Sequence, residues 1–208
     1  MRADGPVVIA MDGSPHSAQT LEWGLTAAEL READVVLARA YQEPREMTQW
    51  SWYPILDDLR FDTEAKQYLA DTVDHATSRH PRLRITTRLL HGPEVPLLRD
   101  LTDDAQLLVV GARGHAGRSR IGRVAAHLAA HARCPVAVVR DVTDEAGPVV
   151  VGVDGSPSSL AAADVAAQEA TLREVPLVVV HARPPLPAPY GTEGIGLLTP
   201  WPRRTRTT

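Results

Sequence analysis

The chain has 208 residues, of which 44% are apolar, so it can hold one large domain or one domain of ordinary size and a fragment. Its net charge of −4, with acidic and basic residues mixed, disfavours a nucleic-acid partner, because domains of that kind usually carry a basic excess. No apolar run approaches the roughly 20 residues of a membrane helix, the first six residues do not resemble a signal peptide, and the single cysteine, Cys134, excludes an internal disulfide, so we expect a cytoplasmic protein.

Short Val-rich runs alternate with longer Ala- and Leu-rich segments of helical period, a pattern typical of repeated β-α-β units. The predicted strands are Val7–Met11, Val35–Ala40, Leu83–Leu90, Gln106–Val110 and Val136–Val139. The predicted helices run from the turn at Asp12–Pro15 to about Glu32, and over Asp58–Arg79, Glu94–Thr102 and Arg118–His131. In the first turn Ser14 or Asp12 is the expected N-cap. The segment Gln42–Leu56, which contains Trp50, Trp52 and Tyr53, is expected to be a surface loop.

The beginning of the chain is repeated near its end, and the two copies align without a gap. The segment Val8–Ser17 returns as Val150–Ser159, and Leu30–Glu32 returns as Leu172–Glu174. We therefore predict a complete domain over residues 1–141 and a truncated β-α-β copy over 148–183, with strands at Val149–Val153 and Leu177–Val180. Residues 184–208 are rich in proline and are expected to be an extended or disordered tail.

One β-α-β unit is too small to bury its own faces. We expect the truncated copy either to dock on the fifth strand of the same chain or to associate between chains.

A glycine-rich loop follows the fourth predicted strand, at Gly111–Arg118, and leads into a helix. Glycines let backbone N–H groups point inward and a helix N-terminus adds positive potential, which together favour a phosphate. Arg113, Arg118, Arg120 and Arg123 add positive charge nearby. A glycine-rich turn with solvated arginines is the alternative. If the strand order is 3-2-1-4-5, Asp12 and Gly111 open onto one crevice at the point where the order reverses.

Three stretches resemble the universal stress protein family, in its actinobacterial tandem branch: Val7–Ser14, Leu108–His115 and His131–Val139. The resemblance implies an α/β fold with a doubly wound, open five-stranded parallel sheet of order 3-2-1-4-5, of the adenine nucleotide alpha hydrolase-like type. It also implies a homodimer that pairs fifth strands. In one branch of the family it implies binding of ATP, with Mg2+.

The motif of the ATP-binding branch is Gly-x2-Gly-x9-Gly-Ser/Thr, and this chain keeps Gly111 and Gly114. A strict count puts Val124 and Ala125 at the last two positions, whereas a count anchored on the segment Ala132–Pro135 puts Gly122 and Arg123 there. Either way a phosphate-binding hydroxyl is lost, for which Arg123 can compensate by pairing with a phosphate directly. The implied nucleotide site is Ala10, Met11, Asp12, Ala40, Gly111, Ala112, Arg113, Gly114, Gly122, Arg123 and Val124.

The residues show no catalytic constellation. His127 and His131 have a metal-compatible i, i+4 spacing but no third ligand, and Cys134 is expected to be a buried structural thiol. We expect a stress-response binding protein that holds an adenine nucleotide and is not an enzyme. The alternatives are a dimerising interaction module without nucleotide, and an adenylate-forming enzyme, which would need a phosphate loop near the first strand.

Overall fold

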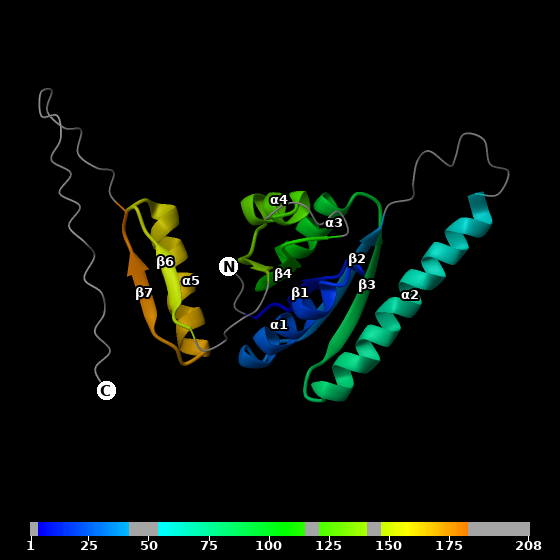
Figure 1. Cartoon of the computed structure of the whole chain (residues 1–208), viewed down its shortest axis with the longest axis horizontal. Helices are drawn as coiled ribbons and strands as arrows, with labels where there is room; N and C mark the ends of the chain where they lie inside the picture. Colours follow the sequence, from blue (N-terminus) through cyan, green and yellow to red (C-terminus); the bar gives the residue numbers. More distant parts are fainter. Residues whose placement is uncertain (1–3, 42–53, 115–120, 141–146, 183–208) are drawn as a thin grey trace, which may run out of the picture.

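The computed structural model describes residues 4–41, 54–114, 121–140 and 147–182, and within 54–62 it describes the backbone alone. The first domain is built on five strands: β1 (Val7–Ala10), β2 (Val35–Tyr41), β3 (Ile85–His91), β4 (Leu107–Gly111) and β5 (Val136–Val139). Their order is β3-β2-β1-β4-β5 and all neighbours are parallel (Figure 1). The predicted fold class is therefore confirmed.

The helices of this domain are α1 (Ser17–Leu30), α2 (Pro54–Arg79), α3 (Glu94–Asp100), the 3-10 turn η2 (Leu101–Asp103) and α4 (Arg123–His131). Three predicted helix starts were wrong. Helix α2 begins at Pro54 and not at Asp58, so Pro54–Leu56 belong to the helix and not to the predicted loop. Helix α1 begins after His16, with no side-chain cap, because Asp12 is used within the preceding turn. Helix α4 begins at Arg123, after Gly122 in extended conformation, and not at Arg118.

The central strands β1, β2 and β4 are largely buried on both faces, as their runs of valine and leucine predict, whereas the edge strand β3 is partly exposed. On one face, β-strand residues such as Ile9 and Leu37 pack with α1 and α2. On the other face, Val8 and Leu108 pack with Leu98 of α3 and with α4. Gly24 allows α1 to lie close to β1, because a Cβ there would come within 2.6 Å of the Ile9 side chain.

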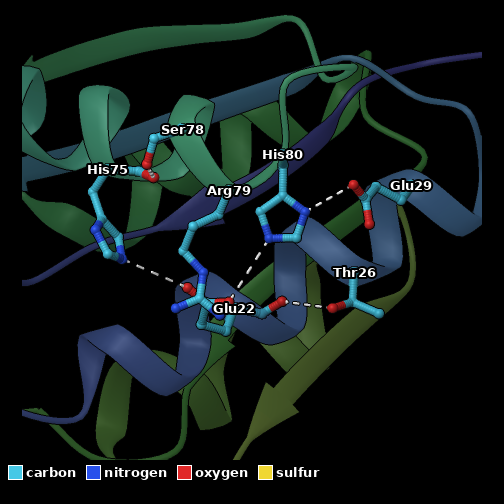
Figure 2. A network of polar contacts seen from close by, with 7 residues as sticks. All are labelled: Glu22, Thr26, Glu29, His75, Ser78, Arg79 and His80. Carbon is cyan, nitrogen blue, oxygen red and sulfur yellow. Dashed lines mark hydrogen bonds and ion pairs between the residues drawn. The ribbon is translucent and has the colours of Figure 1, made fainter.

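Polar contacts join the long helix α2 to α1 on the side away from the sheet (Figure 2). His80 Nδ1 lies 2.8 Å from Glu29 Oε1, and its Nε2 lies 3.8 Å from Glu22 Oε2. His75 and Arg79 also reach the Glu22 carboxylate, at 3.9 and 3.4 Å. Most of these groups are well exposed, so each pair contributes little, but together they fix the register of α2 on α1.

The predicted second copy contains β6 (Val149–Gly152), α5 (Pro157–Leu172) and β7 (Leu177–Val180). The two copies share unusual backbone angles at matching positions: φ is positive at Gly13 and Gly155, and again at Glu32 and Glu174. Strands β6 and β7 form a parallel two-stranded sheet of their own. Of the two alternatives expected for this unit, docking on the fifth strand of the same chain does not occur among the described residues, since β5 pairs only with β4 there, whereas association between chains is not tested.

Candidate functional site

A pocket of about 570 Å³ opens at the carboxyl ends of β1, β2 and β4, where the strand order reverses between β1 and β4. Such switch points are where open α/β sheets hold their ligands. Its walls come from the turn after β1, the end of β2, the start of α3, the loop after β4 and the first turn of α4. The lining residues are Ala10, Met11, Asp12, Ser14, Ser17, Thr20, Ala38, Arg39, Ala40, Tyr41, Glu94, Leu98, Val110, Gly111, Arg113, Gly114, Gly122, Arg123, Val124 and Ala125.

Every residue of the site proposed from the sequence lines this pocket, except Ala112. That residue is 2% exposed, and its backbone is used elsewhere. Its N–H donates to Val139 O on β5, at 2.7 Å, and its carbonyl accepts from Gly122 N, also at 2.7 Å. Ala112 thus ties the start of α4 to the sheet.

The turn after β1 is organised by the carboxylate of Asp12. Its Oδ1 accepts a hydrogen bond from Ser14 N at 2.9 Å and another from Ser17 Oγ at 2.6 Å. Gly13 between them has a φ of +76°, a conformation that glycine adopts without strain. The Asp12 carboxylate therefore fixes the conformation of the turn that lines the pocket.

Ser14 is the buried polar group of this pocket that lacks a protein partner. It is 6% exposed and lines the pocket, and its Oγ has no hydrogen-bond partner among the described residues. A buried hydroxyl without a partner is costly. It is therefore available to a ligand atom.

The turn after β1 and the loop after β4 approach each other closely. A Cβ at Gly114 would lie 2.8 Å from Asp12 Oδ2, and a Cβ at Gly111 would lie 3.1 Å from Thr20 Oγ1. A side chain at Gly114 would therefore displace the Asp12 carboxylate, and one at Gly111 would press against the Thr20 hydroxyl. The predicted meeting of Asp12 and Gly111 on one crevice is what the structure has.

The charged residues of the lining are three arginines, Arg39, Arg113 and Arg123, and two carboxylates, Asp12 and Glu94. Arg123 is the first residue of α4, so its charge adds to the positive end of the helix. This wall of the pocket is suited to an anion.

Arg39 was missed from the sequence. Its guanidinium carbon lies 4.7 Å from the centre of the Tyr68 ring on α2, and its Nη2 lies 3.4 Å from the place of a Cβ at Gly13. The signal was a charged residue inside a strand otherwise expected to be buried on both faces. Glu94, Tyr41, Leu98 and the hydroxyl residues of the first turn were also missed, because nothing local marks them as pocket residues.

Three further candidates lie outside the pocket lining. The rings of His127 and His131 stack, with centres 4.2 Å apart, and His131 Nδ1 contacts His127 O at 2.9 Å. No group of three or more metal-binding side chains occurs in the parts of the chain that the structure describes. Cys134 is partly buried, and this burial raises the pKa of its thiol to about 11. Trp50, Trp52, Tyr53, Arg118 and Arg120 lie outside the described residues.

The second copy repeats the turn without the pocket. Hydrogen bonds from the side chain and backbone of Ser156, and from Ser159, lower the pKa of the exposed Asp154 to about 2. Ser156 also caps α5 by accepting from Ser159 N. A Cβ at Gly155 would meet nothing within 4 Å, whereas Gly13 lies against Arg39. The turn of the second copy therefore has no facing wall among the described residues.

Comparison with known proteins agrees with this architecture. The model of the "Universal stress protein family" matches residues 5–140 and 146–198. Universal stress protein Rv2623 of Mycobacterium tuberculosis is 32% identical over 140 residues, which are 64% of this chain and 46% of that protein. A second universal stress protein of the same organism, Rv2005c, is 32% identical over 139 residues, again 46% of its length. The chain thus spans about half the length of the curated relatives it matches.

Among solved structures, a universal stress protein in complex with cAMP is 26% identical, with a TM-score of 0.50 over 66% of this chain and 98% of that chain. Universal stress protein UspA from Lactobacillus plantarum is 17% identical, with a TM-score of 0.55 over 67% of this chain and 99% of that chain. A universal stress protein from Archaeoglobus fulgidus DSM 4304 is 13% identical, with a TM-score of 0.63 over 86% of this chain and 67% of that chain. These last two similarities bear on the fold alone. No helix of the described ranges combines the length and apolar character needed to span a bilayer.

Proposed function

Because this chain belongs to the universal stress protein family, we propose that its first domain, residues 1–141, binds an adenine nucleotide in the pocket between β1 and β4. The observation that carries the proposal is the close approach of the Asp12 turn to Gly114, which joins a polar turn and a glycine-rich, positively charged loop in one cavity. The related protein solved with cAMP supports the choice of an adenine nucleotide.

The two sides of the pocket differ in chemistry, and this difference suggests how the nucleotide is oriented. Met11, Ala38 and Leu98 are buried apolar residues that offer a surface for a planar base. Gly111, Gly114 and the first turn of α4 offer backbone N–H groups and a positive helix end for phosphate. Arg123 replaces the hydroxyl of the family motif with a charge that can pair with a phosphate oxygen.

If it contacts the nucleotide directly, Asp12 belongs on the base or ribose side, because a carboxylate beside the phosphates would repel them; it can lie beside the phosphates only through a metal ion. A Mg2+ ion carried by a triphosphate would need oxygen ligands, and the lining offers the Asp12 carboxylate and the unpartnered Ser14 hydroxyl. When bound, the ion would neutralise phosphate charge. Asp12 and Ser14 are the residues that would hold it.

We propose a binding and regulatory role for the domain, without catalysis. Among the described lining residues there is no histidine or cysteine beside a hydroxyl, and the Ser17 hydroxyl is bonded to Asp12. The described lining thus offers no histidine or cysteine for nucleophilic catalysis, and the proposal assigns the Ser17–Asp12 pair to holding the turn. A role in a cytoplasmic stress response is part of the same proposal.

Calorimetric titration of the full chain with ATP, AMP and cAMP, with and without Mg2+, tests the proposal. Saturable binding of at least one of them, at one site per chain, is the expected result. Absence of heat with all three would favour the alternative, a nucleotide-free interaction module, for which the loss of the motif hydroxyl at Arg123 is the supporting observation.

A further inference from the structure

The second copy carries nearly all of the exposed apolar surface of the described residues. Among the described residues six large apolar side chains are exposed, and five of them belong to β6, α5 or β7: Val150, Leu160, Leu177, Val179 and Val180. The sixth is Ile121. Apolar groups gathered on one small unit mark a surface that binds something.

One face of the β6–β7 sheet is bare, and we call it the uncovered face; it consists of Val150, Gly152, Val178 and Val180. Successive side chains of a strand point to opposite sides, and Val150 pairs with Val178, so these residues share a face. Val150 is 61% exposed and Val180 is 46% exposed. A Cβ at Gly152 would meet nothing within 4 Å.

The first copy shows what this face requires. The residues at the same repeat positions as Val150 and Val180 are Val8 and Ala38, which are 1% and 0% exposed. They are covered by Leu98 of α3 and by Ala125 and Leu128 of α4. In the first copy this face is covered by an apolar layer that the described part of the second copy does not supply.

Helix α5 does not cover this face, because it packs on the opposite side of the two strands. Val151, Ala166 and Ala170 are the buried residues of that side, at 7%, 8% and 6% exposure. Leu177 and Val179 lie on the same side as Val151 and are 37% and 56% exposed, so α5 covers mainly β6 and leaves β7 partly open there. In Figure 1, α5 lies between the two strands and the first domain, so the uncovered face points away from the first domain. It is open to another molecule.

A second copy of this chain is the partner that fits. Neither β6 nor β7 contains a charged residue, so two uncovered faces meet without repulsion or unpaired charge. The chain's own β5 does not take up the unit, since β6 and β7 form a separate sheet. We propose that two chains associate by packing their uncovered faces against each other about a two-fold axis, as two sheets pack in a sandwich.

This association is independent of the nucleotide pocket and of the edge of β5. It brings Val150 and Val180 of one chain against the same residues of its partner. The interface is apolar, so its strength should change little with salt.

Sedimentation velocity of the full chain over a range of concentrations tests the proposal. The wild type should form dimers, and Val150→Lys with Val180→Lys should weaken them by about tenfold or more, because two charges would be buried. Both positions are solvent-exposed in the single chain, so the thermal unfolding midpoint should stay unchanged. Val150→Thr with Val180→Thr, which keeps the strand-forming shape, should weaken the dimer less.

Leu160→Lys is the matched control. Leu160 is 58% exposed on α5 of the same unit, and its counterpart Ala18 is also exposed in the first copy. This variant should dimerise like the wild type. A monomeric wild type at every concentration, a dimer that survives the double lysine variant, or equal weakening by Leu160→Lys would each overturn the proposal.

Discussion

Arg31 and Arg173 occupy the same position in the two copies of the repeat, and each contacts the helix of the other copy. Arg31, at the end of α1, pairs with Glu169 of α5 and donates to Ala27 O at 2.9 Å. Arg173, at the end of α5, lies over the ring of Trp23 on α1, 4.9 Å from its centre. The ends of the two helices thus form the contact between the first domain and the second copy.

This contact is partly buried. The Arg31 side chain is 8% exposed, and that of Glu169 is 22% exposed. Burial lowers the pKa of Arg31, and the charge of Arg173 lowers it further. Glu169, which also lies 3.4 Å from Arg173 Nε, offsets the charge of both arginines.

Glu169→Ala should loosen the second copy from the first domain, because it leaves two arginines together without their carboxylate. A buried charge that loses its partner typically costs on the order of 1–3 kcal/mol. Hydrogen exchange should therefore accelerate in α5, while the strands of the first sheet stay protected. Gln168→Ala, at an exposed position of the same helix, is the control and should leave both unchanged.

Gly114→Val should abolish nucleotide binding while the domain stays folded. The added side chain begins 2.8 Å from Asp12 Oδ2 and fills the space between the two loops. Gly147→Val, where a Cβ meets nothing within 4 Å, is the matched control. Calorimetry and thermal unfolding measure the two effects, and unchanged affinity in a folded Gly114→Val protein would contradict the proposed site.

Arg123→Ala should weaken nucleotide binding by on the order of 1–3 kcal/mol, if its guanidinium pairs with a phosphate. The comparison is Arg82→Ala, because Arg82 is an exposed arginine before β3, at the other end of the sheet. Titrations with ATP and with adenosine separate the contribution of a phosphate contact from that of the base and ribose. A phosphate contact predicts a loss with ATP and none with adenosine.

Cys134 should react slowly with iodoacetamide in the folded protein. Burial raises the pKa of its thiol from 9.0 to about 11, so at pH 8 the thiolate fraction is about a hundredfold lower than for an ordinary thiol. The rate should rise about tenfold per pH unit up to about pH 11. The denatured chain is the control, and since Cys134 is the only cysteine, total labelling reports it alone.

The same shift has a defined effect on stability. The folded state keeps its proton where the unfolded state has lost it, between about pH 9 and pH 11. The contribution of Cys134 to stability is therefore complete below pH 9 and is lost as the pH rises toward 11. Cys134→Ser should remove this component of the pH dependence.

A chain that ends at Asp141 should retain the fold of the first domain and its nucleotide affinity. Both core clusters lie within residues 7–139, and the second copy adds no strand to the first sheet. Circular dichroism and calorimetry of the shortened chain measure this. Loss of the fold would show that the second copy is part of the first core and that the boundary at residue 141 is misplaced.

The sequence by itself determined the strands, the repeat and the two turns, because these depend on neighbours along the chain. Unbroken valine runs predict the strands, including the run at residues 149–151 in β6, and the turn predicted at Asp12–Pro15 contains Gly13, whose φ is positive. With the family resemblance, the order of the strands followed. The meeting of Asp12 with the loop at Gly111 then needed only that parallel strands end at the same edge.

The tertiary structure alone decided which other side chains share the pocket. Arg39, Glu94 and Leu98 enter it because β2 ends there and α3 begins there, and no neighbouring residue in the sequence indicates that these segments meet. It also decided that β6 and β7 form a separate sheet and that Arg31 meets Glu169. Those outcomes depend on which helices and strands pack on each apolar face. That is a property of the whole fold and not of any one segment.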